Sequence, residues 1–64
     1  MTMLIKGIYI GKTRVSMDID KDGIYTVILS RNNGDYYSIS KKYQSANRKS
    51  AMAAFYRYRK EATA

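Results

Sequence analysis

The chain has no cysteine, histidine, proline or tryptophan among its 64 residues. Without cysteine it forms no disulfide and offers no thiolate to a metal, and without histidine it lacks the commonest zinc ligand and general base. The sequence places no nucleophile beside a base. We therefore predict that the protein is not an enzyme and that it holds no metal and no cofactor.

Long hydrophobic runs are also missing. The N-terminal residues lack the apolar stretch of about 7–15 residues that a signal peptide needs, and no segment approaches the ~18 apolar residues of a membrane span. We therefore expect a cytoplasmic protein with no membrane partner. A chain of 64 residues predicts one small domain, residues 1–64, of marginal stability. A well-packed minimal core and a homodimer are the two ways to stabilise it.

Acidic residues are few, because five Asp and Glu stand against 12 Lys and Arg, for a net charge of +7. The imbalance lies in residues 36–64, where Glu61 is the only acid. The basic residues of that segment are Lys41, Lys42, Arg48, Lys49, Arg57, Arg59 and Lys60. A positive field concentrated in one part of the chain attracts polyanions.

Alternating apolar residues and three turn signals predict strands at about 3–10, 13–19, 24–31 and 36–41. We expect a two-residue turn at Gly11-Lys12, a four-residue loop at 20–23 and a two-residue turn at Asn33-Gly34. With these loops, one face of the sheet collects Leu4, Ile8, Ile10, Val15, Met17, Ile19, Ile24, Thr26, Ile28, Tyr37 and Ile39, with Lys6 as its only charge. The other collects Tyr9, Arg14, Ser16, Asp18, Tyr25, Val27, Leu29, Arg31, Tyr36, Ser38 and Ser40.

A helix is predicted at about 46–61, capped by Ser45 or Asn47. Ala51, Phe55, Tyr58 and Ala62 recur with helical spacing and form its inward stripe. The fold class is therefore α+β, a four-stranded antiparallel β-meander with one C-terminal α-helix packed across the apolar face. Lys49, Arg57 and Lys60 then point outward, with Tyr56 among them.

The segment from Asp18 to Gly23 matches the opening D-x-D-x-D-G of a calcium-binding loop. Calcium binding there requires a bidentate glutamate at the twelfth loop position, which is Leu29 in this chain. We therefore interpret the segment as a solvated acidic turn.

Two surfaces are candidates for binding a polyanion. The first is the helix exterior with the neighbouring strand end, namely Lys41, Lys42, Arg48, Lys49, Arg57, Arg59 and Lys60. The second is the sheet face turned away from the helix, with Arg14, Tyr25, Arg31 and Tyr36. The expected register places Arg31 opposite Tyr36 and Arg14 opposite Leu29. Arginine reads guanine in the major groove, and tyrosine stacks on unpaired bases.

The order of strand, turn, strand, basic segment and helix from Asp22-Gly23-Ile24-Tyr25 to Ser50-Ala51 is similar to the small arm-binding domains of phage-type tyrosine integrases. This resemblance covers about half of the chain and rests on no specific motif. It implies that the sheet face, with the second candidate surface, lies in the major groove of DNA.

We therefore expect a small non-catalytic nucleic-acid-binding protein, with DNA as the favoured ligand, of the kind that phages and mobile elements encode. The alternative is a small inhibitor or adaptor that binds an acidic surface of a partner protein. Two simpler interpretations stay open. The basic helix exterior is a solvated face in the first, and Tyr9, Tyr25 and Tyr36 pack beneath a partner subunit in the second.

Overall fold

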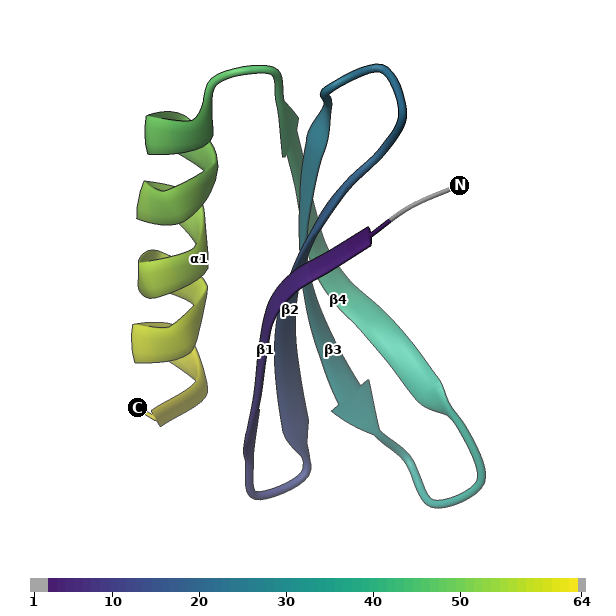
Figure 1. The fold of residues 1–64 in the computed structure, drawn as a ribbon. Coiled ribbons are helices and arrows are strands. Elements are labelled where there is room, and N and C mark those ends of the chain that lie inside the picture. The colour runs from purple at the N-terminus through teal and green to yellow at the C-terminus, as the bar shows by residue number, and fades with distance from the viewer. Residues whose placement is uncertain (1–2, 64) are drawn as a thin grey trace.

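The computed structural model describes residues 3–63. Strands β1 (Met3–Ile10), β2 (Thr13–Ile19), β3 (Tyr25–Asn32) and β4 (Tyr37–Ser45) form one antiparallel sheet in the order β1-β2-β3-β4. Helix α1 (Arg48–Thr63) lies along one side of this sheet (Figure 1). The predicted α+β meander with one C-terminal helix is confirmed.

The start of α1 is fixed by Asn47. Its side-chain oxygen accepts hydrogen bonds from the backbone N–H groups of Lys49 and Ser50, at 2.8 and 3.3 Å. Ser45 supports this cap, because its hydroxyl accepts a hydrogen bond from the Asn47 N–H at 3.0 Å. Of the two capping residues that the sequence offered, Asn47 therefore satisfies the free N–H groups of the first turn.

The core lies between α1 and the two central strands. It consists of buried residues from β2, β3 and α1, namely Val15, Met17, Val27, Leu29, Ala51, Ala54, Phe55 and Tyr58. Because Ala51 and Ala54 are small, the helix axis can approach the sheet closely, and Phe55 fills the space beside them. The predicted inward stripe of the helix is confirmed.

The β1–β2 hairpin has the predicted register, with Ile10 opposite Thr13 and Ile8 opposite Val15. The loop after β2 is one residue shorter than the predicted four-residue loop. Asp20 and Ile24 close that loop through a 3.1 Å hydrogen bond, which leaves three residues between them instead of four between Ile19 and Ile24. Gly23 takes a positive φ of 80°, as a three-residue hairpin loop of this kind requires.

This one-residue difference inverts β3. Val15 pairs with Leu29 instead of Ile28, so Val27 and Leu29 face the helix. Thr26 and Ile28, which we predicted in the core, lie on the opposite side of the sheet. The inversion follows because successive side chains of a strand point to opposite faces.

The β3–β4 hairpin is also shifted from the prediction. Asn32 pairs with Tyr37, and the Asn33 N–H donates to the Tyr36 carbonyl at 2.8 Å, so the tip is Gly34-Asp35 and not Asn33-Gly34. A bulge opposite Leu29 and Ser30 then leaves Ser40 as an extra residue of β4. Tyr37 and Ile39 consequently lie on the side away from the helix, which corrects their predicted place.

A second bulge lies in β1, where Leu4 pairs with Asp18 but Lys6 pairs with Met17. Leu4 therefore faces away from the helix and is 56% exposed, contrary to the prediction that it belongs to the core. We call the side of the sheet without a helix the open face. It carries Leu4, Gly7, Tyr9, Arg14, Ser16, Asp18, Thr26, Ile28, Ser30, Tyr37, Ile39, Lys42 and Gln44.

Candidate nucleic-acid interface

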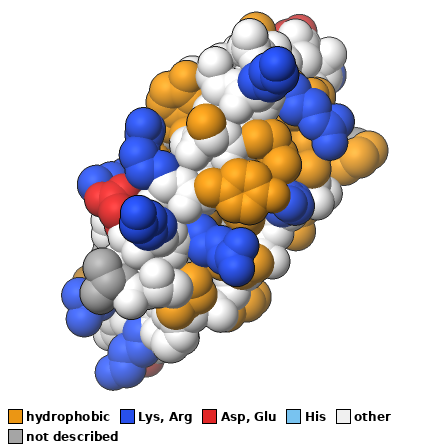
Figure 2. Space-filling view, turned by 90° about the vertical axis from the view of Figure 1, so that its left-hand side faces the viewer, with side chains coloured by type: hydrophobic (Ala, Val, Ile, Leu, Met, Phe, Trp, Pro, Cys, Tyr) orange, Lys and Arg blue, Asp and Glu red, His pale blue; other side chains and the backbone are white. Residues whose placement is uncertain are grey.

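The outer side of α1 carries five exposed Lys and Arg side chains. We call it the basic face, and it consists of exposed residues of the helix, namely Arg48, Lys49, Tyr56, Arg57, Arg59 and Lys60. Figure 2 looks onto this side and shows Lys and Arg side chains distributed around a central hydrophobic area, with little acidic surface. The inward stripe of Ala51, Phe55 and Tyr58 turns these cations to solvent.

The cations of the basic face are not neutralised by nearby carboxylates of the described chain. Within residues 3–63 the only ion pair joins Lys41 and Glu61. The Asp20 carboxylate instead accepts hydrogen bonds from the backbone N–H groups of Asp22 and Ile24, at 2.9 and 3.0 Å. The Asp20 carboxylate is thus hydrogen-bonded to backbone N–H groups of its own turn. The described residues hold no cluster of three or more metal-ligating side chains.

Tyr56 is the exposed aromatic residue of the basic face. It is 46% exposed, and its ring lies edge-on to that of Phe55, with centroids 5.8 Å apart and planes at 81°. Because Phe55 is buried in the core, this contact fixes the Tyr56 ring relative to the helix. On the same helix, the Arg57 guanidinium lies 5.8 Å from the centroid of the Tyr58 ring.

Lys6 joins this surface from β1, and the sequence did not reveal its role. Its ammonium donates a hydrogen bond to the Tyr56 hydroxyl at 3.1 Å and lies 5.1 Å from the ring centroid. This hydrogen bond and the charge of Lys6 hold the pKa of Tyr56 below its usual value, and the charge of Arg59 adds to the effect. The one signal in the sequence was a lone lysine among the inward residues of the first strand.

The predicted pair Lys41-Lys42 does not join the helix cations as a unit. Lys41 lies on the helix side of β4 and is neutralised by Glu61. Lys42 pairs with Ile28 and lies on the open face. Neighbouring residues of a strand point to opposite faces, so two consecutive lysines do not reinforce one another.

The predicted second surface, with Arg14, Tyr25, Arg31 and Tyr36, does not exist as one face. Arg14 is on the open face, where its guanidinium lies 5.8 Å from the Tyr9 ring. Tyr25 packs against the core on the helix side, and Tyr36 is a 64% exposed loop residue. The observed pairs are Arg14 with Ser30 and Arg31 with Ser38, so both predicted cross-strand pairs were wrong.

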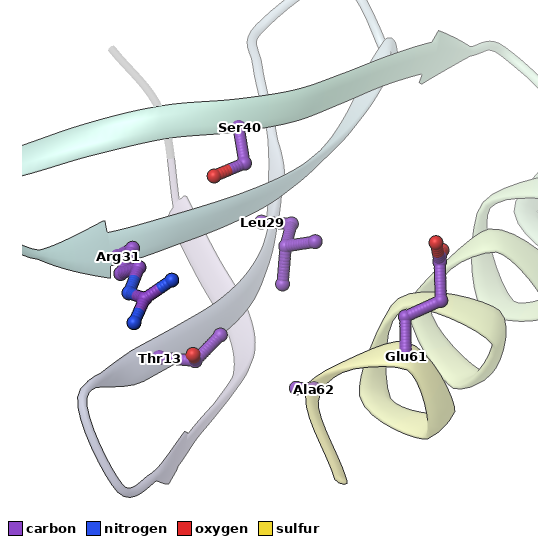
Figure 3. Close-up of a pocket in the computed structure, with 6 residues that line it drawn as sticks. All are labelled: Thr13, Leu29, Arg31, Ser40, Glu61 and Ala62. Atoms are coloured by element: carbon purple, nitrogen blue, oxygen red, sulfur yellow. The ribbon is translucent and has the colours of Figure 1, made fainter. Parts of the chain in front are cut away.

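Arg31 instead lines a cavity of about 350 Å³ between the sheet and the last turn of α1. Figure 3 shows Leu29 between Arg31 on the sheet and Glu61 on the helix. The other lining residues are Thr13, Ser40 and Ala62. One guanidinium beside two hydroxyl groups suits a small anionic or hydroxylated group. The carboxylate of Glu61 is held by Lys41.

A second cavity, of about 270 Å³, lies on the basic face itself and is lined by Tyr56, Arg59, Lys60 and Thr63. It brings an aromatic ring, two cations and a hydroxyl group to one place on the helix surface. These are the groups that contact the bases and phosphates of nucleic acids.

No protein-family model, no curated protein and no solved structure matches this chain. Among residues 3–63, α1 is too short and too polar to pass through a membrane, and the described chain has no other helix. The arrangement of charge and aromatic side chains is therefore the basis for inferring a function.

Proposed function

We propose that this protein binds nucleic acid, with DNA as the favoured ligand, through the basic face of α1, and that it acts by binding and not by catalysis. The observation that carries the proposal is that the cations of this face have no carboxylate partner within residues 3–63, where Lys41–Glu61 is the only ion pair. Lys and Arg side chains that neutralise phosphates release condensed counterions, and this release drives binding.

The first turn of α1 supports an anionic ligand. Arg48 and Lys49 occupy this turn, which contains no acidic residue. Cations near a helix N-terminus oppose the helix dipole, at a cost of about 0.3–1 kcal/mol each. A phosphate beside this turn is attracted by both side chains and by the positive end of the dipole.

Tyr56 extends the contact beyond phosphates. Its ring is exposed, oriented by Phe55 and flanked by Arg59 and Lys60. A ring in this position packs on a sugar or stacks on an unpaired base while the neighbouring cations hold the backbone. Contacts of this kind position a protein on nucleic acid without reading its sequence.

Fluorescence anisotropy with a labelled DNA duplex, the matching single strand and an RNA strand tests the proposal. We expect binding that weakens steeply between about 50 and 300 mM salt. The double variant Arg57→Gln/Lys60→Gln should bind at least ~10-fold more weakly and reduce the slope of log K against log salt by about 2.

The matched control is Lys12→Gln/Lys21→Gln, which removes the same charge from two exposed residues in hairpin loops. It should keep most of the affinity, because only the general field of the protein changes. A protein that binds none of the three ligands at low salt would rule the proposal out. Equal losses in both double variants would show that the basic face is not the interface.

An acidic partner protein is the second candidate for the same surface. Tyr56 beside Arg57 and Arg59 favours it, because Tyr and Arg are enriched in the centres of protein interfaces. A pull-down from nuclease-treated lysate separates the candidates. A partner that stays bound after nuclease treatment and is lost with Arg57→Gln/Lys60→Gln supports the protein partner.

A further inference from the structure

The open face of the sheet leaves large apolar side chains in water. Leu4, Tyr9 and Ile39 are 56%, 67% and 62% exposed, while α1 covers only the other side (Figure 1). Single exposed hydrophobic residues are ordinary on a protein surface, but several on one sheet face indicate an interaction surface. The arrangement of residues on this face indicates which partner it fits.

Cross-strand pairing arranges the open face in three rows that run across the four strands. The rows, each in the order β1, β2, β3, β4, are Leu4–Asp18–Thr26–Gln44, Gly7–Ser16–Ile28–Lys42 and Tyr9–Arg14–Ser30–Ile39. The middle row begins with Gly7, which has no side chain, and Ser16, which is only 6% exposed. The β1–β2 half of the middle row is therefore low, and a second surface can approach it closely there.

The open face carries Arg14 and Asp18, whose opposite charges can pair between two copies of this face. Arg14 and Asp18 lie in the two outer rows of β2, four residues apart, which is about 13 Å along an extended strand. They are too far apart to pair within one chain, and neither forms an ion pair within residues 3–63. A two-fold axis along the middle row would exchange the two outer rows and bring Arg14 of one copy against Asp18 of the other, twice.

We propose that the open face binds a second copy of this chain, so that two sheets pack face to face with their helices outside. The same axis places Tyr9 of one copy against Leu4 of the other and Ile28 against its own symmetry mate. The axis also brings Lys42 close to its own symmetry mate, but Lys42 lies on the edge strand β4, where the two long side chains diverge into solvent at the rim. Face-to-face sheets of this kind pack about 10 Å apart.

The area of the open face limits the expected affinity of the dimer. The two larger dimensions of the molecule are 33 and 24 Å, so the open face can at most approach the ~800 Å² per partner of a standard interface. Six residues of the interface are charged per copy pair, namely Arg14 and Asp18 of the outer rows, which form two Arg–Asp contacts, and Lys42 of the middle row. We therefore expect a weak dimer with a Kd on the order of 10 µM.

The dimer does not depend on nucleic-acid binding, because it uses the opposite side of the sheet. If the proposed function also holds, the dimer carries two basic faces on opposite outer sides and bridges two nucleic-acid segments. Self-association of nucleic-acid-free protein therefore tests the dimer separately from the proposed function.

Two charge variants provide the test by sedimentation equilibrium between about 5 and 500 µM. Arg14→Asp makes the open face acidic at both positions, and Asp18→Arg makes it basic at both. Each variant alone should dimerise at least ~10-fold more weakly than the unchanged chain, because like charges then face each other. A 1:1 mixture should recover a dimer within about threefold of the original affinity, since an acidic face then meets a basic one.

The controls are Lys12→Asp and Asp22→Arg, which change the charge equally at exposed loop residues and should leave the dimer unchanged. Circular dichroism checks that each variant is folded. If a charge variant does not fold, Ile28→Lys replaces it and should also give monomers. An unchanged chain that is monomeric at the highest concentration, or folded variants whose mixture stays monomeric, would overturn the proposal.

Discussion

Both faces of this one sheet carry large hydrophobic side chains, but only those on the helix side are buried. On the helix side Val15, Met17 and Val27 are 0% exposed, whereas Leu4, Tyr9 and Ile39 on the open face are more than half exposed. Strand β3 shows the ambiguity in its simplest form, because Val27, Ile28 and Leu29 are three consecutive apolar residues. Hydrophobicity alone does not say which of them faces the helix.

The strongest test of this comparison exchanges neighbouring residues of β3. Val27→Lys should unfold the protein or destabilise it by about 4 kcal/mol or more, because a charge is then buried without a partner. Ile28→Lys should change the free energy of unfolding by less than ~1 kcal/mol, because its side chain can reach solvent. Urea denaturation followed by circular dichroism, at concentrations where the chain is monomeric, measures both.

Equal destabilisation by the two substitutions would contradict the observed register. The reverse order, with Ile28→Lys the more damaging, would restore the register predicted from the sequence. The same pair of variants thus separates the two possible inner faces of β3.

A smaller effect is expected at the loop that sets this register. Gly23→Ala should destabilise the protein by about 1 kcal/mol, because an alanine must adopt the positive φ of 80°. No atom lies within 4 Å of the added methyl group, so the cost comes from the backbone alone. Thermal unfolding of Gly23→Ala measures it.

Gly7→Ala is the matched control on the open face. Its methyl group would meet Leu4 and Val15 atoms at 3.9 Å, an ordinary contact, and its φ is not in the left-handed region. Alanine should therefore be neutral or stabilise the strand slightly. A cost at Gly7 as large as at Gly23 would show that the loop is not special.

The smallest effect is expected at the contact between Lys6 and Tyr56, where the helix side of the sheet meets solvent. Lys6→Met should raise the pKa of Tyr56 towards its usual value of about 10, since the hydrogen bond and the charge of Lys6 lower it. NMR titration of the Tyr56 ring measures the change. Lys21→Met, at an exposed loop residue, should leave the Tyr56 pKa as it is.

The sign of the pH dependence follows from this lowered pKa. The folded chain favours the tyrosinate form of Tyr56. The stabilisation that this form gives the folded chain is therefore fully present only above the pKa that Tyr56 has in the unfolded chain. It is lost as the pH falls through the folded pKa, and protonated Tyr56 at neutral pH contributes none of it. Lys6→Met should therefore reduce stability at about pH 10, where the tyrosinate and the ammonium coexist, more than at neutral pH.

The candidate site was predicted from the sequence only where it lies on the helix. The period of Ala51, Phe55 and Tyr58 fixes which way a helix faces, so Lys49, Arg57 and Lys60 were correctly placed outward. On the sheet, Arg14, Tyr25 and Arg31 were assigned to one face, but the structure separates Arg14 from the other two. A one-residue error shifts a helical pattern by 100°, whereas it moves a strand residue to the opposite face.

The amino-acid sequence by itself determined the order of four strands and one helix, the inward stripe of α1 and the excess of positive charge on its outer side. These properties depend on local periodicity and composition. Only the tertiary structure decided which residues of β3 and β4 enter the core, because loop lengths and two bulges set the register. It alone brought Lys6 beside Tyr56, 50 residues away in the chain, because that contact requires α1 to pack across the sheet that contains β1.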